Sequence, residues 1–127
     1  MNIKNLLTNQ YFKSYRLEGE SANTIEITVD KLDTNAAPEL DREFRVYWSN
    51  NVDQILGGTS HKINMTQVKY LDSSGLSSLV AINEASKAKN GNNKTIELYN
   101  CNSGVYRVLE ISSLKDTFKI TPKYDQN

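Results

Sequence analysis

The chain has a single cysteine, a single histidine and only two prolines among its 127 residues. One cysteine excludes an internal disulfide, and one cysteine with one histidine excludes most zinc sites. Lysine plus arginine and aspartate plus glutamate both number 15, so the formal net charge is zero. Because nucleic-acid-binding proteins normally carry a basic excess, this balance argues against a nucleic-acid partner. It also removes the case for a polybasic membrane anchor.

Long hydrophobic segments are missing as well. The longest aliphatic run is Leu79 to Ile82, far short of the ~20 residues that span a bilayer. The first ten residues contain no apolar core long enough for a signal peptide. We therefore expect a cytoplasmic protein without membrane insertion, and a length of 127 residues suits one domain over 1–127.

The hydrophobic pattern that is present changes its period along the chain. Residues 11–17 and 24–29 alternate between apolar and polar side chains, and the polar turn between them predicts an N-terminal β-hairpin. After Asp33 the spacing becomes helical and predicts a long amphipathic helix over residues 36–56. Thr34 or Asn35 can cap this helix.

The second half of the chain alternates short strands with helices. Helices are predicted over residues 74–89 and 103–111, and short strands over residues 61–65, 95–99 and 117–120, with residues 68–71 running on to the start of the second helix. Strands joined through helices run parallel. The sequence therefore predicts an α/β fold: a mixed sheet of four to five strands packed against three to four helices, with a short disordered tail from about residue 121 to residue 127.

Candidates for catalysis are few. The chain has neither a Walker phosphate loop nor a Gly-x-Gly-x-x-Gly motif. His61 is better interpreted as an exposed residue at a strand start, and Cys101 as a small packing residue. Asp30 and Asp33 could form an acid/base pair, but a role in a turn and a helix cap is favoured. We expect no enzymatic activity, no bound metal and no cofactor.

The most informative stretch is Asp72-Ser73-Ser74-Gly75-Leu76, where a predicted strand passes into a helix. Asp and Ser are preferred helix caps and Gly allows close approach, so a purely structural role explains these residue types. A serine hydroxyl at a helix N-terminus is also a suitable acceptor for phosphate, because this end of a helix tolerates anions. On the residue types alone, the structural role as a helix cap is favoured.

The same stretch resembles the strongest motif of the STAS domain family, and within that family it resembles the anti-sigma factor antagonists. Residues 30–37 are similar to the family's Gly-x-Leu-Asp-x-x-x-Ala stretch, with Asp30 replacing the usual Gly. The resemblance continues through residues 105–111, 114–116 and 118–120 and covers Phe12 to Thr121. Two features depart from the family: Asn64 stands where an Asp is common, and only residues 121–127 remain for a closing helix.

The resemblance implies a bacterial transcription regulator that switches partners by phosphorylation. The unmodified chain would bind an anti-sigma factor that is also a serine kinase, which releases a sigma factor. The kinase would phosphorylate Ser73, and a serine phosphatase would remove the phosphate. The remaining partner-binding residues would be Asp33, Thr34, Asp72, Ser74, Gly75 and Leu76.

Two alternative functions stay open. A STAS-fold protein can instead be a scaffold in a stress-signalling assembly or a subunit of a lipid-transport assembly, without control of a sigma factor. The intact Ser73 disfavours these relatives, because they can lack a serine that can be phosphorylated. A small enzyme is the second alternative.

Overall fold

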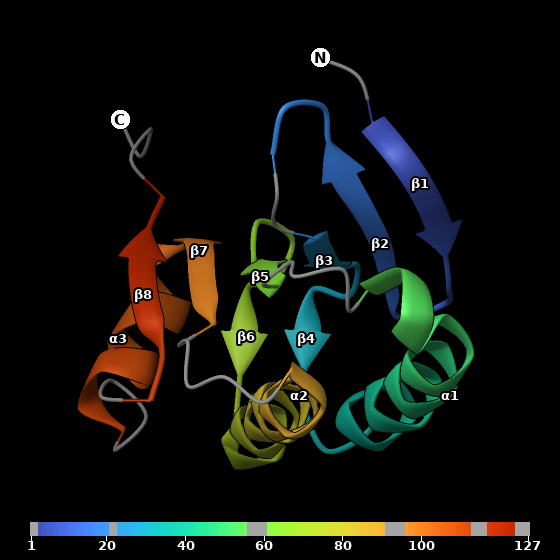
Figure 1. Ribbon diagram of the computed structural model, residues 1–127. Helices are drawn as coiled ribbons and strands as arrows, with labels where there is room; N and C mark the ends of the chain where they lie inside the picture. The colour runs from blue at the N-terminus through green and yellow to red at the C-terminus, as the bar shows by residue number, and fades with distance from the viewer. Residues whose placement is uncertain (1–2, 21–22, 56–60, 91–95, 113–116, 124–127) are drawn as a thin grey trace.

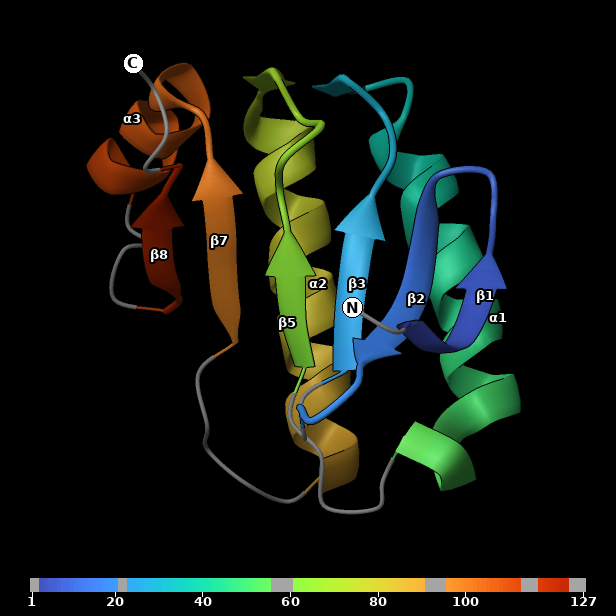
Figure 2. The same ribbon diagram turned by 90° about the horizontal axis from the view of Figure 1, so that it is seen from above.

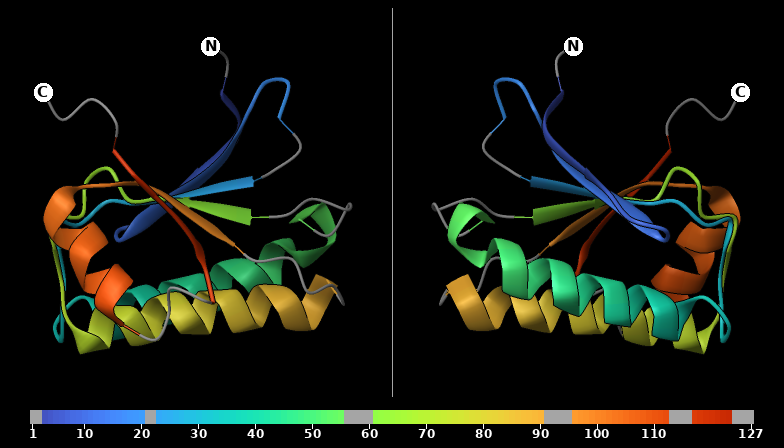
Figure 3. Two further views of the ribbon diagram at one scale, coloured as in Figure 1. Left: turned by 90° about the vertical axis from the view of Figure 1, so that its left-hand side faces the viewer. Right: turned by 90° about the vertical axis from the view of Figure 1, so that its right-hand side faces the viewer.

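The computed structural model describes residues 3–20, 23–55, 61–90, 96–112 and 117–123. These residues form two layers, a β-sheet and a layer of helices (Figure 1, Figure 3). The long helices α1 (Ala37–Ile55) and α2 (Ser73–Asn90) lie side by side against one face of the sheet. The short helix α3 (Ser103–Ile111) packs beside the last strands. The predicted α/β class is confirmed.

The main sheet has six strands in the order β1-β2-β3-β5-β7-β8. The β1–β2 and β2–β3 pairs are antiparallel, and the β3–β5, β5–β7 and β7–β8 pairs are parallel (Figure 2). The mixed sheet and the N-terminal hairpin were both predicted correctly. The strand bounds are β1 Ile3–Thr8, β2 Phe12–Leu17, β3 Asn23–Ile27, β5 His61–Asn64, β7 Glu97–Cys101 and β8 Lys119–Pro122.

The prediction differs from the structure at the two ends of the chain. The sheet has six strands rather than four or five, because residues 3–8 form β1 at its edge. This segment does not alternate in hydrophobicity and owes its extended form to backbone pairing with β2. At the other end, Thr121 and Pro122 belong to β8 rather than to a tail, and residues 124–127 lie outside the described part.

A second, two-stranded sheet leads into the long helices. β4 (Lys31–Leu32) and β6 (Tyr70–Leu71) run parallel, with Leu32 opposite Leu71. β4 continues into α1 and β6 continues into α2. The N-termini of both long helices therefore lie next to each other at one end of the molecule (Figure 1).

The core lies between the main sheet and the helices. Four aromatic rings join β2 to α1, with centroid distances of 5.4–6.0 Å between Phe12, Phe44, Tyr47 and Trp48. Leu79 and Ile82 bring α2 onto the same core. Burial of these side chains holds both helices, and hence their N-termini, in fixed positions relative to the strands.

Candidate functional site at two strand-to-helix junctions

The site is built from two equivalent junctions, β4 to α1 and β6 to α2. Because Leu32 pairs with Leu71, the next residues, Asp33 and Asp72, occupy corresponding positions. The Asp72 N–H donates to the Leu32 carbonyl oxygen at 3.5 Å, which ties the second junction to the first. The motif found in the sequence and the separate stretch around Asp33 therefore meet in space.

The two aspartates play the same part in their junctions. Asp72 Oδ1 accepts hydrogen bonds from the Ser74 N–H at 2.9 Å and the Gly75 N–H at 3.1 Å. Asp33 Oδ1 accepts from the Asn35 N–H at 3.0 Å and the Ala36 N–H at 3.1 Å. Each carboxylate thus pairs N–H groups that a helix start leaves free.

The prediction that Thr34 or Asn35 caps α1 is wrong. The carboxylate of Asp33 holds the turn that leads into the helix, and the Asp33 carbonyl oxygen accepts from the Ala37 N–H at 2.8 Å. The helix pattern placed the start of the helix at residue 36, close to the observed start at Ala37, but the residue that pairs the free N–H groups is Asp33, because the chain turns at residues 33–36 as it leaves β4. Asp33 is therefore the turn-and-cap residue that the sequence favoured over an acid/base role.

Gly75 is required at its position by close packing. A Cβ atom on Gly75 would lie 2.3 Å from the Leu32 carbonyl oxygen and 2.5 Å from Leu71 Cδ1. Both distances are far below van der Waals contact, so no larger residue fits without movement of the backbone. The glycine lets the first turn of α2 pass directly against β4 and brings the two junctions together.

The serines of the first turns of α2 differ in accessibility. Ser73, the first residue of the helix, is exposed, and so is Ser77. The Ser74 hydroxyl is half-buried and lies 3.3 Å from the hydroxyl of Thr34. The Ser78 hydroxyl is buried and donates to the Ala37 carbonyl oxygen at 3.1 Å. Of the two serines in the motif, Ser73 is the exposed one.

The junction surface includes an aromatic residue that the sequence analysis missed. Tyr70 precedes the motif, pairs with Lys31 across β4–β6, and is 52% exposed. An aromatic side chain that is largely exposed beside a candidate site is a common feature of partner-binding surfaces. Leu76, by contrast, is half-buried and packs against the core. The sequence did contain a signal for this residue: Tyr70 is an aromatic residue two positions before Asp72. The strand that contains it is too short to bury it.

Other candidates do not form a catalytic group within the described part. Cys101 is fully buried, and burial raises the pKa of its thiol to about 12, so it is not a nucleophile at neutral pH. His61 begins β5 as predicted, but its side chain lies outside the described residues. Among the described residues, no group of three or more histidine, cysteine, aspartate or glutamate side chains could hold a metal ion. None of the described helices is long and apolar enough to cross a membrane.

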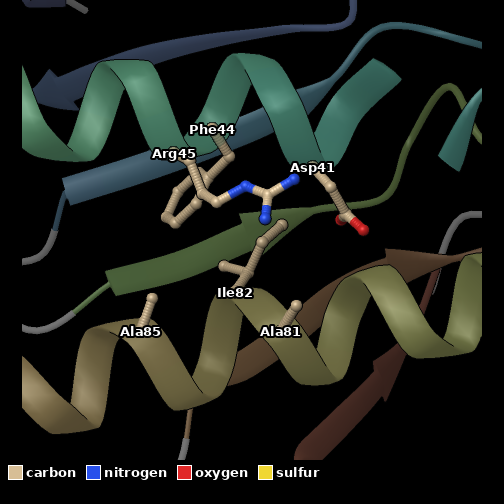
Figure 4. A pocket seen from close by; sticks show the side chains of 6 residues that line it. All are labelled: Asp41, Phe44, Arg45, Ala81, Ile82 and Ala85. Atoms are coloured by element: carbon tan, nitrogen blue, oxygen red, sulfur yellow. The ribbon is translucent and has the colours of Figure 1, made fainter. Parts of the chain in front are cut away.

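A small apolar hollow lies between α1 and α2, away from the junctions (Figure 4). Its volume is about 150 Å³. None of the residues predicted for the site lines it. The lining side chains are Asp41, Phe44, Arg45, Ala81, Ile82 and Ala85.

Comparisons with known proteins agree with this architecture. A candidate anti-sigma factor antagonist (tm1081) from Thermotoga maritima is similar in fold, with a TM-score of 0.63 and 16% sequence identity over 92% of this chain and 91% of that chain. The unphosphorylated anti-sigma factor antagonist SpoIIAA gives a TM-score of 0.49 and 17% identity over 80% of this chain and 83% of that chain. No curated protein matches the sequence. The STAS domain model matches residues 25–127, which include both junctions, and the chain therefore belongs to the STAS domain family.

Proposed function

We propose that the chain is an anti-sigma factor antagonist that is switched off by phosphorylation of Ser73. In its unmodified form it binds an anti-sigma factor that is also a serine kinase, and the bound sigma factor is released for transcription. The kinase then modifies Ser73 and the complex dissociates, until a serine phosphatase resets the switch. The observation that carries this proposal is the exposed Ser73 hydroxyl at the first position of α2, on a turn held rigid by Asp72 and Gly75.

The geometry of the junctions suits such a switch. A phosphate adds about −1.5 to −2 charges at pH 7. On Ser73 it lies at a helix N-terminus, which tolerates anions, so the fold stays intact. The same surface already carries the carboxylates of Asp33 and Asp72, so a phosphate on Ser73 makes it strongly negative and changes which partner surface it can bind.

The other residues of the site divide by position. Thr34 is exposed beside Ser74, and these two hydroxyls extend the surface around Ser73. Asp33, Asp72 and Gly75 hold the turns, and Leu76 anchors the helix start to the core. In this proposal the first group contacts the partner and the second group gives that surface its shape. The chain itself catalyses no reaction, needs no cofactor, and acts in the cytoplasm without binding nucleic acid.

The test is phosphorylation by candidate serine-kinase anti-sigma factors with ATP, followed by mass mapping of the modified residue. Ser73→Ala should keep its affinity for the kinase and resist labelling. Ser73→Asp should lose roughly tenfold or more in affinity, because it adds a charge where the partner docks. Ser77→Ala is the matched control, since Ser77 is also exposed on α2. Labelling of Ser77 alone, or full affinity of Ser73→Asp, would contradict the assignment.

A further inference from the structure

The apolar hollow between α1 and α2 is separate from the surface around Ser73. Phe44 and Ile82, which are 2% and 1% exposed, form its walls, and the small side chains of Ala81 and Ala85 leave space on the α2 side (Figure 4). Ala81 follows Ser73 at a distance of about 12 Å along the axis of α2. A group bound in this hollow would therefore contact both long helices without covering Ser73.

The size of the hollow limits what it can hold. Its volume is about 150 Å³, whereas the pockets that take drug-sized ligands usually measure roughly 300–1,000 Å³. An apolar cavity of about 150 Å³ in another protein binds benzene. The hollow is thus large enough for one branched aliphatic group or one phenyl group, and it is too small for a nucleotide.

Two opposite charges from α1 stand at the mouth of the hollow. Asp41 is half-buried and Arg45 is exposed, and both side chains line the hollow (Figure 4). Among the described residues neither of them forms an ion pair, whereas Glu39 and Arg42 in the same helix do. Asp41 Oδ1 is covered from solvent and has no hydrogen-bond partner in the described part of the structure. Because a covered carboxylate without a partner costs free energy, it is suited to bind a positively charged group.

Arg45 supplies the opposite charge one helical turn after Asp41. Its guanidinium group extends over the hollow, above Ile82 (Figure 4). Side chains one turn apart on a helix have Cβ atoms about 5–6 Å from each other, a separation that a group with both charges on one carbon atom can bridge. A guanidinium binds a carboxylate through two parallel hydrogen bonds. The two side chains can therefore hold both ends of a zwitterion, whereas a ligand with a single charge would leave one of them unpaired.

We propose that the hollow binds a free α-amino acid with an apolar side chain, such as leucine or phenylalanine. The α-ammonium group pairs with the carboxylate of Asp41, the α-carboxylate pairs with the guanidinium of Arg45, and the side chain enters the apolar hollow. Ala81 and Ala85 admit this side chain, because larger residues at these two positions would fill the space. The bound amino acid bridges α1 and α2.

A side chain of a partner protein is the other group that could fill the hollow. Within a polypeptide the amino and carboxyl groups of a residue are uncharged, so an internal residue of a partner would leave Asp41 and Arg45 unpaired. The two charges at the mouth therefore favour a free amino acid. This site does not depend on the proposed switch, because neither its charges nor its apolar walls include a residue of the surface around Ser73.

The test is titration of the isotope-labelled full chain with leucine, followed by the NMR resonances of its backbone amides. We expect a dissociation constant on the order of 0.1 mM, which ligands of this size can reach. Glycine lacks the side chain, isoamylamine lacks the carboxylate and isocaproate lacks the ammonium group, so each should bind more weakly by roughly tenfold or more. No response to leucine at about 10 mM, a large excess over that constant, would overturn the proposal. So would equal binding of leucine and isoamylamine.

Two substitutions test the charges and the hollow separately. Asp41→Asn removes the charge that pairs the ammonium group, and Ala81→Leu fills the hollow, so each should weaken leucine binding by roughly tenfold or more. Thermal melts without leucine check that both variants fold. Glu84→Gln is the matched control, because Glu84 is exposed on α2 and does not line the hollow, and it should bind like the parent. Full affinity of Ala81→Leu, or an equal loss in Asp41→Asn and Glu84→Gln, would refute the inference.

Discussion

The hydroxyl oxygens of Thr34 and Ser74 lie 3.3 Å apart although the two residues are 40 positions apart in the sequence. This contact joins the turn before α1 to the first turn of α2. The surface around Ser73 is therefore composite, and the β4–α1 turn is as much a part of it as the Asp-Ser-Ser-Gly motif. The contacts that hold this surface, and the core behind it, can be tested by substitution.

Gly75→Ala should destabilise the fold strongly. The new Cβ atom would lie 2.3 Å from the Leu32 carbonyl oxygen, which is backbone and cannot move aside cheaply. We expect a loss of about 1–3 kcal/mol or more in the free energy of unfolding, measured by urea denaturation. Gly104→Ala in α3 is the control, because its nearest contact would be Asn102 Oδ1 at 3.9 Å. That variant should gain about 0.5–1 kcal/mol from higher helix propensity. Similar stabilities for the two variants would contradict the close packing at Gly75.

Asp33→Ala and Asp72→Ala should each lower stability by about 0.5–2 kcal/mol, because each removes a carboxylate that pairs two backbone N–H groups. The corresponding Asn variants should lose much less stability, because the Asn amide oxygen can accept the same two hydrogen bonds. Asp30→Ala is the control: this side chain is exposed, and among the described residues it has no hydrogen-bond partner. Its effect should stay within about 0.5 kcal/mol. Thermal melts at matched pH would show whether the two junctions are as equivalent in energy as they are in geometry.

Asn83→Leu should stabilise the chain. Asn83 is fully buried in α2, and neither of its amide atoms has a hydrogen-bond partner in the described part of the structure. Replacing such a group by an apolar one of similar size removes a desolvation penalty of about 1–3 kcal/mol. Ser78→Ala provides the contrast, because the buried Ser78 hydroxyl is paired with the Ala37 carbonyl oxygen, and its removal should lower stability by about 1 kcal/mol. A clear loss of stability in Asn83→Leu would mean that the amide is satisfied in solution.

Cys101 should make the fold sensitive to alkaline pH. Burial raises the pKa of its thiol to about 12, whereas an unfolded thiol titrates near ~8.5. The folded chain therefore keeps a proton that the unfolded chain releases, and the free energy of unfolding falls as pH rises from about 9 toward 12, by up to ~1.4 kcal/mol per pH unit.

The comparison that isolates this effect is Cys101→Ala, followed by denaturation at several pH values. The free energy of unfolding of the variant should fall less steeply above pH 9 than that of the parent. Part of the pH dependence should remain, because burial also raises the pKa of Tyr15 to about 12. At neutral pH the two slopes should agree. Thiol reagents should label the folded parent slowly at pH 8, and fast labelling would show that Cys101 is not buried.

Much of this protein could be predicted from local patterns. Strict alternation at Ile25 and Ile27 predicted a strand, and the helical spacing of Leu40 and Phe44 predicted α1, because burial of one face dictates the period of the sequence. The Asp-Ser-Ser-Gly turn was recognisable because capping and close approach each demand particular residue types. These constraints act over a few neighbouring residues, so they can be recognised in a single sequence.

Other features depend on which segments meet. β1 lacks an alternating pattern, so its place in the sheet is decided by backbone hydrogen bonds to β2. The sequence placed the cap of α1 at Thr34 or Asn35, whereas the path of the chain from β4 gives that role to Asp33. Neither the place of β1 nor the cap of α1 can be predicted from local periodicity, because both depend on pairing between strands.

The sequence by itself determined the order of the three helices and of the strands that it predicted, the faces that they bury and the turn that carries Ser73. The tertiary structure alone decided that Thr34 stands beside Ser74, that Gly75 lies against Leu32, and that the apolar side of β1 is left uncovered. The physical reason is that propensity and amphipathicity act over a few residues, whereas these contacts arise only when parallel strands from distant parts of the chain are aligned in one register.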